Sequence, residues 1–373
     1  MEIDLEKIKK MGVALLASRT TQLGKEPCGG SDRVFWEDVK ILEENHIPFK
    51  IYTFDTFKNF VNKKVIKINP KIKIYPFFTL WYCSEFLLKE KKSILLCYNE
   101  PMPAGISPKR SIIRFDWFTA LPRWWKISFF LKRFKKANYL FPSKYMKTLF
   151  LKNYPLIPKS RTYVIYNSVD LNLFKPFSKN KNYLRIGFVG QWTKRKGLHF
   201  LLKAWEIIKS QIPQAELWIA GSPFLWARTS PVSDAEEIYE LMKFYERKGM
   251  IKIKGEYPYE RMPDFYNSIN LLVIPSLEES FGLTAIEAMA CGVPIIASKI
   301  GGLKEIINEN CGILVPPADS KKLATAIIKL LKDDVLREKL SKGALTHSKN
   351  FSYEFRKFKF LKLLEKIAKA NLK

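Results

Sequence analysis

The sequence predicts an α/β protein made of two doubly wound domains, each with a parallel sheet. Short apolar runs alternate with segments of helical periodicity in both halves of the chain, the pattern of a parallel sheet with helices on both faces. A polar stretch, Phe177–Asn182, separates the two series. The length of 373 residues and the hydrophobic content of 47% are enough for two cores.

The first series opens with an apolar strand at Met11–Ala17. Asp32–Glu44 follows as a helix, because its apolar residues recur at three- and four-residue spacing. Ser143 is a favourable N-cap for a helix after a short strand. The remaining elements expected in this half are strands at Phe49–Thr53, Ile94–Tyr98, Tyr139–Pro142 and Thr162–Tyr166, and a helix at Lys126–Asn138.

The second series begins with a strand at Leu184–Val189, which a basic loop, Gly190–Gly197, connects to the helix Leu198–Lys209. The last segment, Phe351–Leu372, is expected to be an amphipathic basic helix. The elements expected between them are strands at Ala215–Ala220, Ile251–Lys254, Leu271–Pro275 and Ile295–Ala297, and helices at Asp234–Lys248, Pro263–Asn267 and Thr284–Ala290.

The segment Pro275–Gly302 carries the most chemical information. It follows an apolar strand, and it holds two carboxylates, Glu279 and Glu287, with a glycine turn between them. The first N–H groups of a helix lack intrahelical partners, so a strand, glycine turn and helix start form a favourable site for an anionic ligand. Glu279 is expected at the start of this helix, and Glu287 about two turns along it.

This segment resembles the donor-site signature of the retaining glycosyltransferases of family 4. The matching positions form the pattern PS-x-x-E-x-FG-x-x-x-x-EAMA-x-G-x-P-I-I-A-x-x-x-GG. The resemblance implies the GT-B fold, in which two Rossmann-like domains face each other across a cleft that holds the active site. It implies an acceptor-binding domain at 1–172, a nucleotide-sugar-binding domain at 173–350, and a helix at 351–373 that crosses back to the first domain.

Three further segments resemble parts of the same family. Phe188–Gly197 is similar to the loop that carries the pyrophosphate of the donor. Ile165–Asp170 is similar to the hinge motif, and Gly29–Val34 is similar to the glycine turn on the acceptor side, so Gly29 and Gly30 are acceptor-side candidates.

The resemblance implies roles for individual donor-site residues. Lys196 corresponds to the lysine that neutralises the growing charge of the leaving diphosphate, the main requirement of this transition state. Glu279 corresponds to the residue that faces the donor sugar, and Glu287 to the glutamate that accepts hydrogen bonds from the ribose hydroxyls. The resemblance also implies that backbone N–H groups of Phe281, Gly282 and Leu283 hold the sugar or phosphate.

The chain departs from the family at two places. Gln191 follows Gly190 where an arginine is usual, and a neutral amide supplies neither the charge nor the bidentate fork. Lys194 or Arg195 could replace it from the same loop. The family's catalytic histidine has no counterpart at Cys97–Glu100, where Asn99 or Glu100 is an acceptor-side candidate or caps a loop.

No metal or organic cofactor is expected beside the nucleotide-sugar substrate. The three histidines are scattered, and no Asp-x-Asp motif stands where it could hold an ion, since Asp333 and Asp334 are placed in a late polar loop. The resemblance implies a retaining outcome, transfer of a hexose, and a diphosphate held by Lys196 and the helix dipole without a divalent cation.

The cysteine count and the lengths of the apolar runs indicate where in the cell the protein is expected. Five cysteines without metal-ligand spacing predict a reducing, cytoplasmic setting. No apolar run is long enough for a transmembrane helix, and the charged start of the chain does not read as a signal peptide.

The net charge of +28 points to an anionic partner. Aromatic and basic residues interleave at 115–154, which suits an anionic membrane surface or a domain-core helix with a solvated basic face, and less well nucleic acid. Three functions stay open: a transferase acting on a lipid-linked or glycan acceptor at the membrane, a transferase acting on nucleic acid, and a non-catalytic module that binds nucleotide sugars or other anions.

Overall fold

The computed structural model describes residues 3–17, 30–53, 65–67, 86–117, 128–177, 183–222 and 233–372. The chain divides into two compact units: unit 1 comprises Met1–Tyr166 and Arg356–Lys373, and unit 2 comprises Asn167–Phe355. The boundary expected at residue 172 therefore lies inside unit 2. The terminal helix returns to unit 1 at Arg356, a few residues after the expected position at 351.

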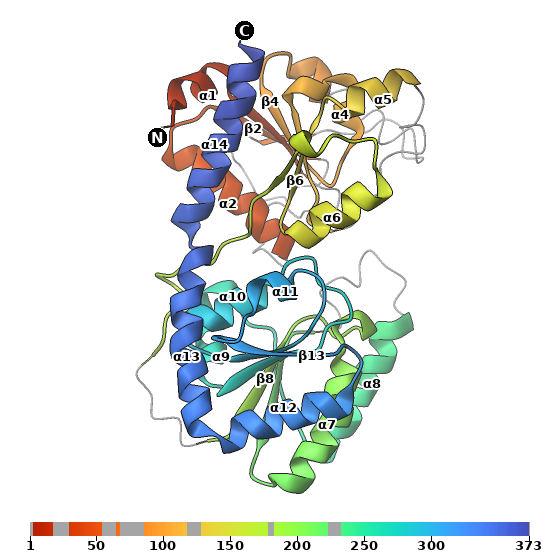
Figure 1. The fold of residues 1–373 in the computed structure, drawn as a ribbon, viewed down its shortest axis with the longest axis vertical. Coiled ribbons are helices and arrows are strands. Elements are labelled where there is room, and N and C mark those ends of the chain that lie inside the picture. Colours follow the sequence, from red (N-terminus) through yellow and green to blue (C-terminus); the bar gives the residue numbers. More distant parts are fainter. Residues whose placement is uncertain are drawn as a thin grey trace. The chain divides into compact units, whose positions relative to one another are not determined.

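The described strands of unit 1 form a parallel sheet of seven strands in the order β3-β2-β1-β4-β5-β6-β7. Figure 1 shows helices packed against this sheet. The strands are β1 (Val13–Leu16), β2 (Phe49–Thr53), β3 (Val65–Lys67), β4 (Ile94–Tyr98), β5 (Ser111–Arg114), β6 (Asn138–Phe141) and β7 (Thr162–Val164). The helices are α1 (Leu5–Met11), α2 (Gly30–Glu44), α4 (Met102–Ile106), α5 (Ser128–Phe134), α6 (Lys144–Asn153) and α14 (Tyr353–Asn371), with 3-10 turns η1 (Pro108–Arg110) and η3 (Lys159–Arg161).

Several boundaries in unit 1 differ from the sequence prediction by a few residues, and two of them have a clear local cause. The described part of the helix expected at Lys126–Asn138 ends at Phe134, and Asn138 begins β6 instead. Asn138 joins the sheet because its buried side-chain amide donates to the carbonyl of Ser111 on the neighbouring strand, at 3.1 Å. Met11 ends α1 rather than beginning a strand, and Gly12 leaves the helix with a φ of 69°. The N-cap expected at Ser143 is confirmed, since its hydroxyl accepts from the N–H of Met146 at 3.1 Å.

The described strands of unit 2 form a second parallel sheet, in the order β10-β9-β8-β11-β12-β13. The strands are β8 (Arg185–Val189), β9 (Glu216–Ala220), β10 (Lys252–Gly255), β11 (Leu271–Ile274), β12 (Ile295–Ser298) and β13 (Gly312–Val315). The helices are α7 (Leu198–Gln211), α8 (Ser233–Arg247), α9 (Met262–Asn267), α10 (Leu283–Ala290), α11 (Leu303–Ile306), α12 (Ser320–Lys332) and α13 (Asp334–Ser348), with 3-10 turns η4 (Lys194–Lys196), η5 (Tyr259–Arg261) and η6 (Lys349–Phe351).

The placement of Asp333 and Asp334 in a polar loop is wrong. Asp333 is the N-cap of α13, and its carboxylate accepts from the N–H of Leu336 at 2.8 Å, while Asp334 is the first residue of the helix. Aspartate suits both positions, because it satisfies an orphan N–H and complements the positive end of the helix.

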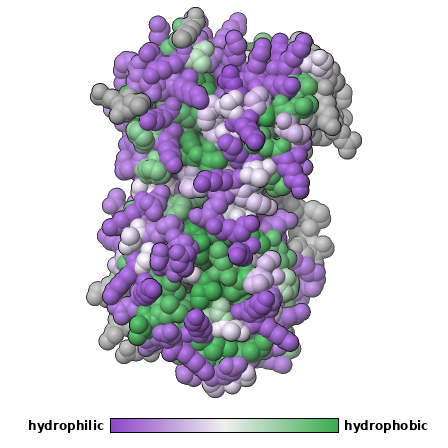
Figure 2. Space-filling model, viewed as in Figure 1, coloured by the Kyte–Doolittle hydropathy of each residue, from purple (hydrophilic) through white to green (hydrophobic). Residues whose placement is uncertain are grey.

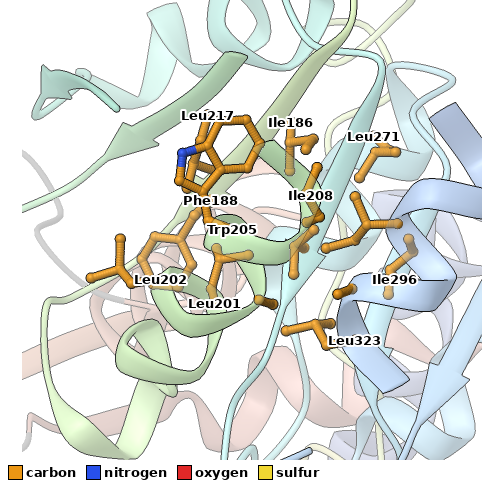
Figure 3. Close-up of a cluster of buried hydrophobic side chains, with 14 of the residues drawn as sticks. Ile186, Phe188, Leu201, Leu202, Trp205, Ile208, Leu217, Leu271, Ile296 and Leu323 are labelled. Atoms are coloured by element: carbon orange, nitrogen blue, oxygen red, sulfur yellow. The ribbon is translucent and has the colours of Figure 1, made fainter. Parts of the chain in front are cut away.

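The core of unit 2 lies between α7, α12 and one face of the sheet. Helix α7 buries residues at three- and four-residue spacing, among them Leu201, Trp205 and Ile208. Figure 3 shows them pointing toward Ile186, Leu217 and other apolar side chains of the strands. Trp205 is fully buried, and its indole N–H donates to the carbonyl of Met250 at 2.7 Å. The strands whose carboxyl ends carry the site loops therefore pack on a dense layer of apolar side chains.

Helix α14 lies along unit 1 beside α1 and α2 (Figure 1). Its apolar side chains, including Phe360 and Leu364, are buried. Arg356 and Asp38 of α2 form an ion pair at 2.5 Å, with side chains 1% and 0% exposed. The hydroxyl of Tyr98 donates to the other oxygen of Asp38, at 2.6 Å. The basic amphipathic helix expected from the sequence is thus anchored on unit 1 by a buried charge network.

Candidate active site

Two of the predicted catalytic side chains meet in unit 2. The ammonium of Lys196, in η4 after β8, lies 2.7 Å from Oε2 of Glu279, in the loop between β11 and α10. Their side chains are 22% and 12% exposed. Both loops follow the carboxyl ends of parallel strands, where α/β proteins bind their ligands. A cation and a carboxylate are therefore paired at a partly solvent-exposed position, beside the carboxyl ends of the parallel strands.

Backbone contacts hold these two loops together. The N–H of Leu277 donates to the carbonyl of Arg195 at 2.8 Å. Gly197 has a φ of 71°, and a Cβ added there would lie 1.8 Å from the carbonyl oxygen of Pro275. A side chain at position 197 is therefore excluded by the backbone of the opposite loop, which explains why glycine follows the basic residues of η4.

Gly282 and Gly302 shape the start of α10 in the same way. Gly282 has a φ of 117°, and a Cβ there would lie 2.8 Å from the side chain of Leu303. The N–H of Gly302 donates to the carbonyl of Glu279 at 3.0 Å. The side chain of Phe281 is buried and packs edge-on against Phe351. Leu283 is the first residue of α10, Gly282 is its N-cap, and Phe281 directly precedes the cap.

Glu287 lies inside α10, with a residue exposure of 3%, and its Oε2 accepts from the hydroxyl of Tyr266 at 2.7 Å. Tyr266 is fully buried in α9, and its ring contacts that of Phe174. The sequence analysis did not identify Tyr266 as a site residue. No local pattern marks it, because the contact with Glu287 arises from the packing of α9 against α10.

In the loop predicted to bind the pyrophosphate, the backbone at Gly190 lies very close to the backbone at Gly221. Gly190 follows β8 with a φ of 156°, and a Cβ at Gly221, which follows β9, would lie 2.0 Å from the carbonyl oxygen of Gly190.

Gln191 comes next and is half-buried. Of the two residues that could replace the missing arginine, Lys194 is paired with Glu237 at 2.5 Å. Arg195 is exposed and has no carboxylate partner among the residues that the structure describes, so it is the better placed of the two.

Three buried polar atoms lie on the same two loops without a protein hydrogen-bond partner in the described ranges. They are Nε1 of Trp192 and Oγ1 of Thr193 beside Gln191, and Oγ of Ser276 three residues before Glu279. Buried polar groups are normally hydrogen-bonded. All three belong to the two loops that carry Lys196 and Glu279.

On unit 1, Asn99 and Glu100 follow β4. Asn99 has a φ of 54°, unusual for a residue other than glycine, and its side-chain oxygen accepts from the N–H of Asp116 at 3.0 Å. Glu100 accepts from the N–H of Met102 at 3.4 Å, at the start of α4. Gly30 begins α2. Gly29 and residues 118–127 of the predicted aromatic and basic segment lie outside the described residues.

The sequence analysis also missed a buried ion pair beside Asn99. Nε of Arg114, at the end of β5, donates to Oδ1 of Asp116 at 2.8 Å. Burial raises the pKa of the Asp116 carboxyl above its ordinary value, and Arg114 offsets that rise only in part. The only sequence signal was a lone acidic residue in a basic stretch, and the parallel pairing of β4 with β5 brings the pair to Asn99.

Within the described ranges, His, Cys, Asp and Glu side chains form no group of three or more suited to a metal ion. Cys97, Cys291 and Cys311 are buried free thiols. None of the helices in the described part of the chain combines the length and apolarity that crossing a bilayer requires.

Comparison of the whole fold places it among glycosyltransferase structures. A sucrose-phosphate synthase from Thermosynechococcus elongatus is similar with a TM-score of 0.76 and 21% identity, over 96% of this chain and 100% of that one. Anabaena HepE, solved in complex with UDP and glucose, is similar with a TM-score of 0.67 and 19% identity, over 95% and 99%. The two parallel-sheet units therefore have the GT-B fold.

The sequence comparisons match unit 2 to a family of glycosyltransferases. The model described as Glycosyl transferases group 1 matches residues 170–347. A relative from Catenulispora acidiphila, D-inositol 3-phosphate glycosyltransferase 1, is 28% identical over 207 residues, which cover 52% of this chain and 49% of that protein. The chain thus spans about half the length of the curated relatives it matches. Residues 170–347 therefore match the family model of the glycosyl transferases of group 1.

Proposed function

We propose that this protein is a retaining glycosyltransferase that moves a sugar from a nucleotide-sugar donor to a lipid-linked or glycan acceptor without a divalent cation. The observation that carries the proposal is the pairing of Lys196 with Glu279 at 2.7 Å, on two loops joined by backbone contacts at the sheet edge of unit 2. The HepE complex with UDP and glucose supports a nucleotide-sugar donor, and the relative named as an inositol phosphate glycosyltransferase supports glycosyl transfer as the reaction.

In the proposed reaction, Lys196 leaves its contact with Glu279 for the diphosphate of the donor. The bond between the anomeric carbon and the diphosphate oxygen breaks, and the diphosphate leaves with the bonding electrons. An acceptor hydroxyl oxygen forms the new bond to the same face of the anomeric carbon, and its proton passes to the leaving diphosphate. An ammonium held at this point stabilises the transition state more than the ground state, because negative charge grows on the leaving group. Arg195 and the first N–H groups of α10 add positive potential without a metal ion.

Glu279 and Glu287 have different proposed partners. Glu279, released from Lys196, faces the donor sugar, accepts from its hydroxyls and stabilises positive charge near the anomeric carbon. Glu287 binds the ribose hydroxyls, and the hydrogen bond from Tyr266 fixes its orientation. On unit 1, we assign acceptor binding to Asn99 and Glu100, and add Asp116, whose carboxylate lies beside Asn99.

Donor binding is tested by calorimetry with UDP-, GDP- and ADP-sugars in the presence of EDTA. We expect one donor to bind the wild type and to lose at least tenfold in affinity in Glu287→Ala. Glu278→Ala is the matched control, since Glu278 is exposed and lies beside Glu279. Thermal melts of both variants separate a lost contact from a lost fold.

Three outcomes would overturn parts of the proposal. If none of the donors binds, the non-catalytic module becomes the better interpretation, with Gln191 as its cause. Binding that requires magnesium would contradict the proposed metal independence. An inverted anomeric configuration of the product, read by proton NMR, would contradict retention.

A further inference from the structure

The chain is held against the donor site soon after it enters unit 2. Unit 2 begins at Asn167, and the segment 174–177 that follows is hydrogen-bonded to α9. Figure 1 shows α9 beside α10, the helix that carries Glu287, and the two helices are in contact. The attachment of this segment to α9 therefore lies one helix away from a carboxylate that we assign to the donor.

Asn267, the last residue of α9, holds this segment with both the oxygen and the nitrogen of its side-chain amide. Its Oδ1 accepts from the N–H of Phe177 at 2.7 Å, and its Nδ2 donates to the carbonyl of Lys175 at 3.0 Å. The same Nδ2 donates to the carbonyl of Pro263, one turn earlier in α9, at 2.9 Å. Because the residue is only 2% exposed, water does not compete for these bonds.

The segment held by Asn267 places the ring of Phe174 against that of Tyr266. Phe174 is 1% exposed, and its ring centroid lies 6.1 Å from that of Tyr266 and 5.3 Å from that of Tyr259. The hydroxyl of Tyr266 in turn donates to Oε2 of Glu287 at 2.7 Å. A continuous series of contacts therefore leads from the amide of Asn267 to the carboxylate of Glu287.

Hydrogen bonds, rather than apolar contact alone, distinguish this attachment. Figure 2 shows that hydrophobic residues are common on the pictured side of unit 2. Aromatic rings in contact can shift a little against each other, whereas hydrogen bonds fix the backbone at defined distances and angles. A ligand-binding side chain is only as precisely placed as the groups that support it. The bonds of Asn267 therefore bear on the orientation of Glu287.

We propose that Asn267 is a positioning residue of the donor site, which acts through Phe174 and Tyr266 on the carboxylate of Glu287. Its own amide bonds to protein groups and does not contact the ligand. Without these bonds, the ring of Phe174 can move away from Tyr266, and the hydrogen bond that orients Glu287 loosens. The inference rests on the proposed function, in which Glu287 accepts from the ribose hydroxyls of the donor.

The test compares nucleotides that have the ribose hydroxyls with nucleotides that lack them. Calorimetry measures the binding of UDP, GDP and ADP, and of the dideoxy form of each, to the wild type and to Asn267→Ala. For the nucleotide that the wild type binds, we expect the variant to lose at least about fivefold in affinity. The dideoxy form should bind both proteins within about twofold, because it offers Glu287 no hydroxyl. A merely structural defect would weaken the binding of both forms.

Asn270→Ala is the matched control. Asn270 is 5% exposed, and its Oδ1 accepts from the N–H of Arg185 at 2.8 Å, so it also holds the chain, at the start of β8. That bond lies beyond the segment 174–177 and involves neither Phe174 nor Tyr266. The control should melt at a lower temperature than the wild type and still bind the nucleotide within about twofold of it.

A double-mutant cycle tests whether Asn267 acts through Tyr266. Tyr266→Phe removes the hydroxyl that reaches Glu287. If both residues orient the same carboxylate, Tyr266→Phe/Asn267→Ala should bind about as weakly as Tyr266→Phe alone.

Phe174→Leu keeps an apolar side chain but removes the ring, and should show the same selective loss for the nucleotide that has the ribose hydroxyls. This variant tests the proposal even if Asn267→Ala does not fold.

Several results would overturn the proposal. Equal losses for the two nucleotide forms in Asn267→Ala would give Asn267 a purely structural role, and so would an equal loss in Asn270→Ala. Additive losses in the double variant would show that Asn267 does not act through Tyr266. Two other results would overturn the assignments on which the inference rests. A wild type that binds a nucleotide and its dideoxy form equally well would contradict the ribose role of Glu287, and one that binds none of the nucleotides would contradict the proposed function.

Discussion

The hydroxyl of Tyr266 donates to Oε2 of Glu287 at 2.7 Å, and both residues are buried. The pair joins α9 to α10 and fixes one oxygen of a carboxylate that we assign to the ribose of the donor. Tyr266, which no sequence motif marks, thus orients Glu287, which belongs to the family signature.

Tyr266→Phe removes this hydrogen bond and leaves the ring in place. We expect the donor to bind at least about tenfold more weakly, because a lost hydrogen bond to a charged group costs on the order of 1.5–3 kcal/mol. Calorimetry measures the affinity. Tyr183→Phe is the control, because its hydroxyl makes only a 3.4 Å contact with the carbonyl of Asn267. Equal losses in the two variants would contradict a specific role for Tyr266.

Lys196→Met should reduce the turnover of the donor by about 10²–10³, the range typical of a lost electrostatic contact to a developing anion. Thermal stability should change little, since a partly exposed ion pair contributes at most about 1 kcal/mol. Steady-state kinetics checks this, with Lys203→Met on the exposed side of α7 as control. A variant that kept turnover within threefold of the wild type would remove Lys196 from the mechanism.

Gly197→Ala should be strongly destabilising. It combines a positive φ with a Cβ placed 1.8 Å from a backbone carbonyl, so the two site loops would have to separate. Gly249→Ala is the matched control, because Gly249 has a φ of 66° and open space around the missing Cβ. We expect about 1 kcal/mol for the control, the cost of the left-handed conformation alone, and at least about 3 kcal/mol for Gly197→Ala. Urea unfolding of both variants measures the difference, and similar losses would contradict the close approach of the loops.

Glu216 predicts a pH dependence of stability. Although burial opposes the shift, hydrogen bonds from Lys252, Arg185 and Trp218 lower the pKa of Glu216 to about 2, from an ordinary value of 4.5. The folded state therefore favours the ionised carboxylate. This contribution is present above pH 4.5 and is lost as the pH falls toward 2. Because the site is largely open to solvent, its size is about 1 kcal/mol.

Melting curves between pH 5 and about 2.5 test this contribution in Glu216→Gln. The variant should be less stable than the wild type at the upper end of this range and converge with it at the lower end. Glu309→Gln, an exposed glutamate of unit 2, should run parallel to the wild type throughout. A constant offset for Glu216→Gln would contradict the shifted pKa.

The elements that carry the donor-site candidates were predictable, because each is encoded in a contiguous segment. Gly197 and Gly282 occupy positions where the backbone has a positive φ. Glu279 and Glu287 lie in one continuous loop-and-helix segment. Tyr266 and the Arg114–Asp116 pair were not predictable, because parallel pairing and helix packing bring them to the site from other elements. Asn138 and Asp333 were misplaced for a related reason. A buried hydrogen bond to Ser111 draws Asn138 into the sheet, and Asp333 caps a helix that the sequence analysis did not anticipate.

The separation of 318 positions between Asp38 and Arg356 also sets an order of events during synthesis. Unit 2 is continuous from Asn167 to Phe355, so all of it has been translated before Arg356 is added. Until then, Asp38 lacks the cation that neutralises it in the folded unit, and a buried carboxylate without its partner is strongly unfavourable. The part of the chain made first therefore completes its fold last. A chain released by a ribosome that stops before Arg356 would have a complete unit 2 and an incomplete unit 1.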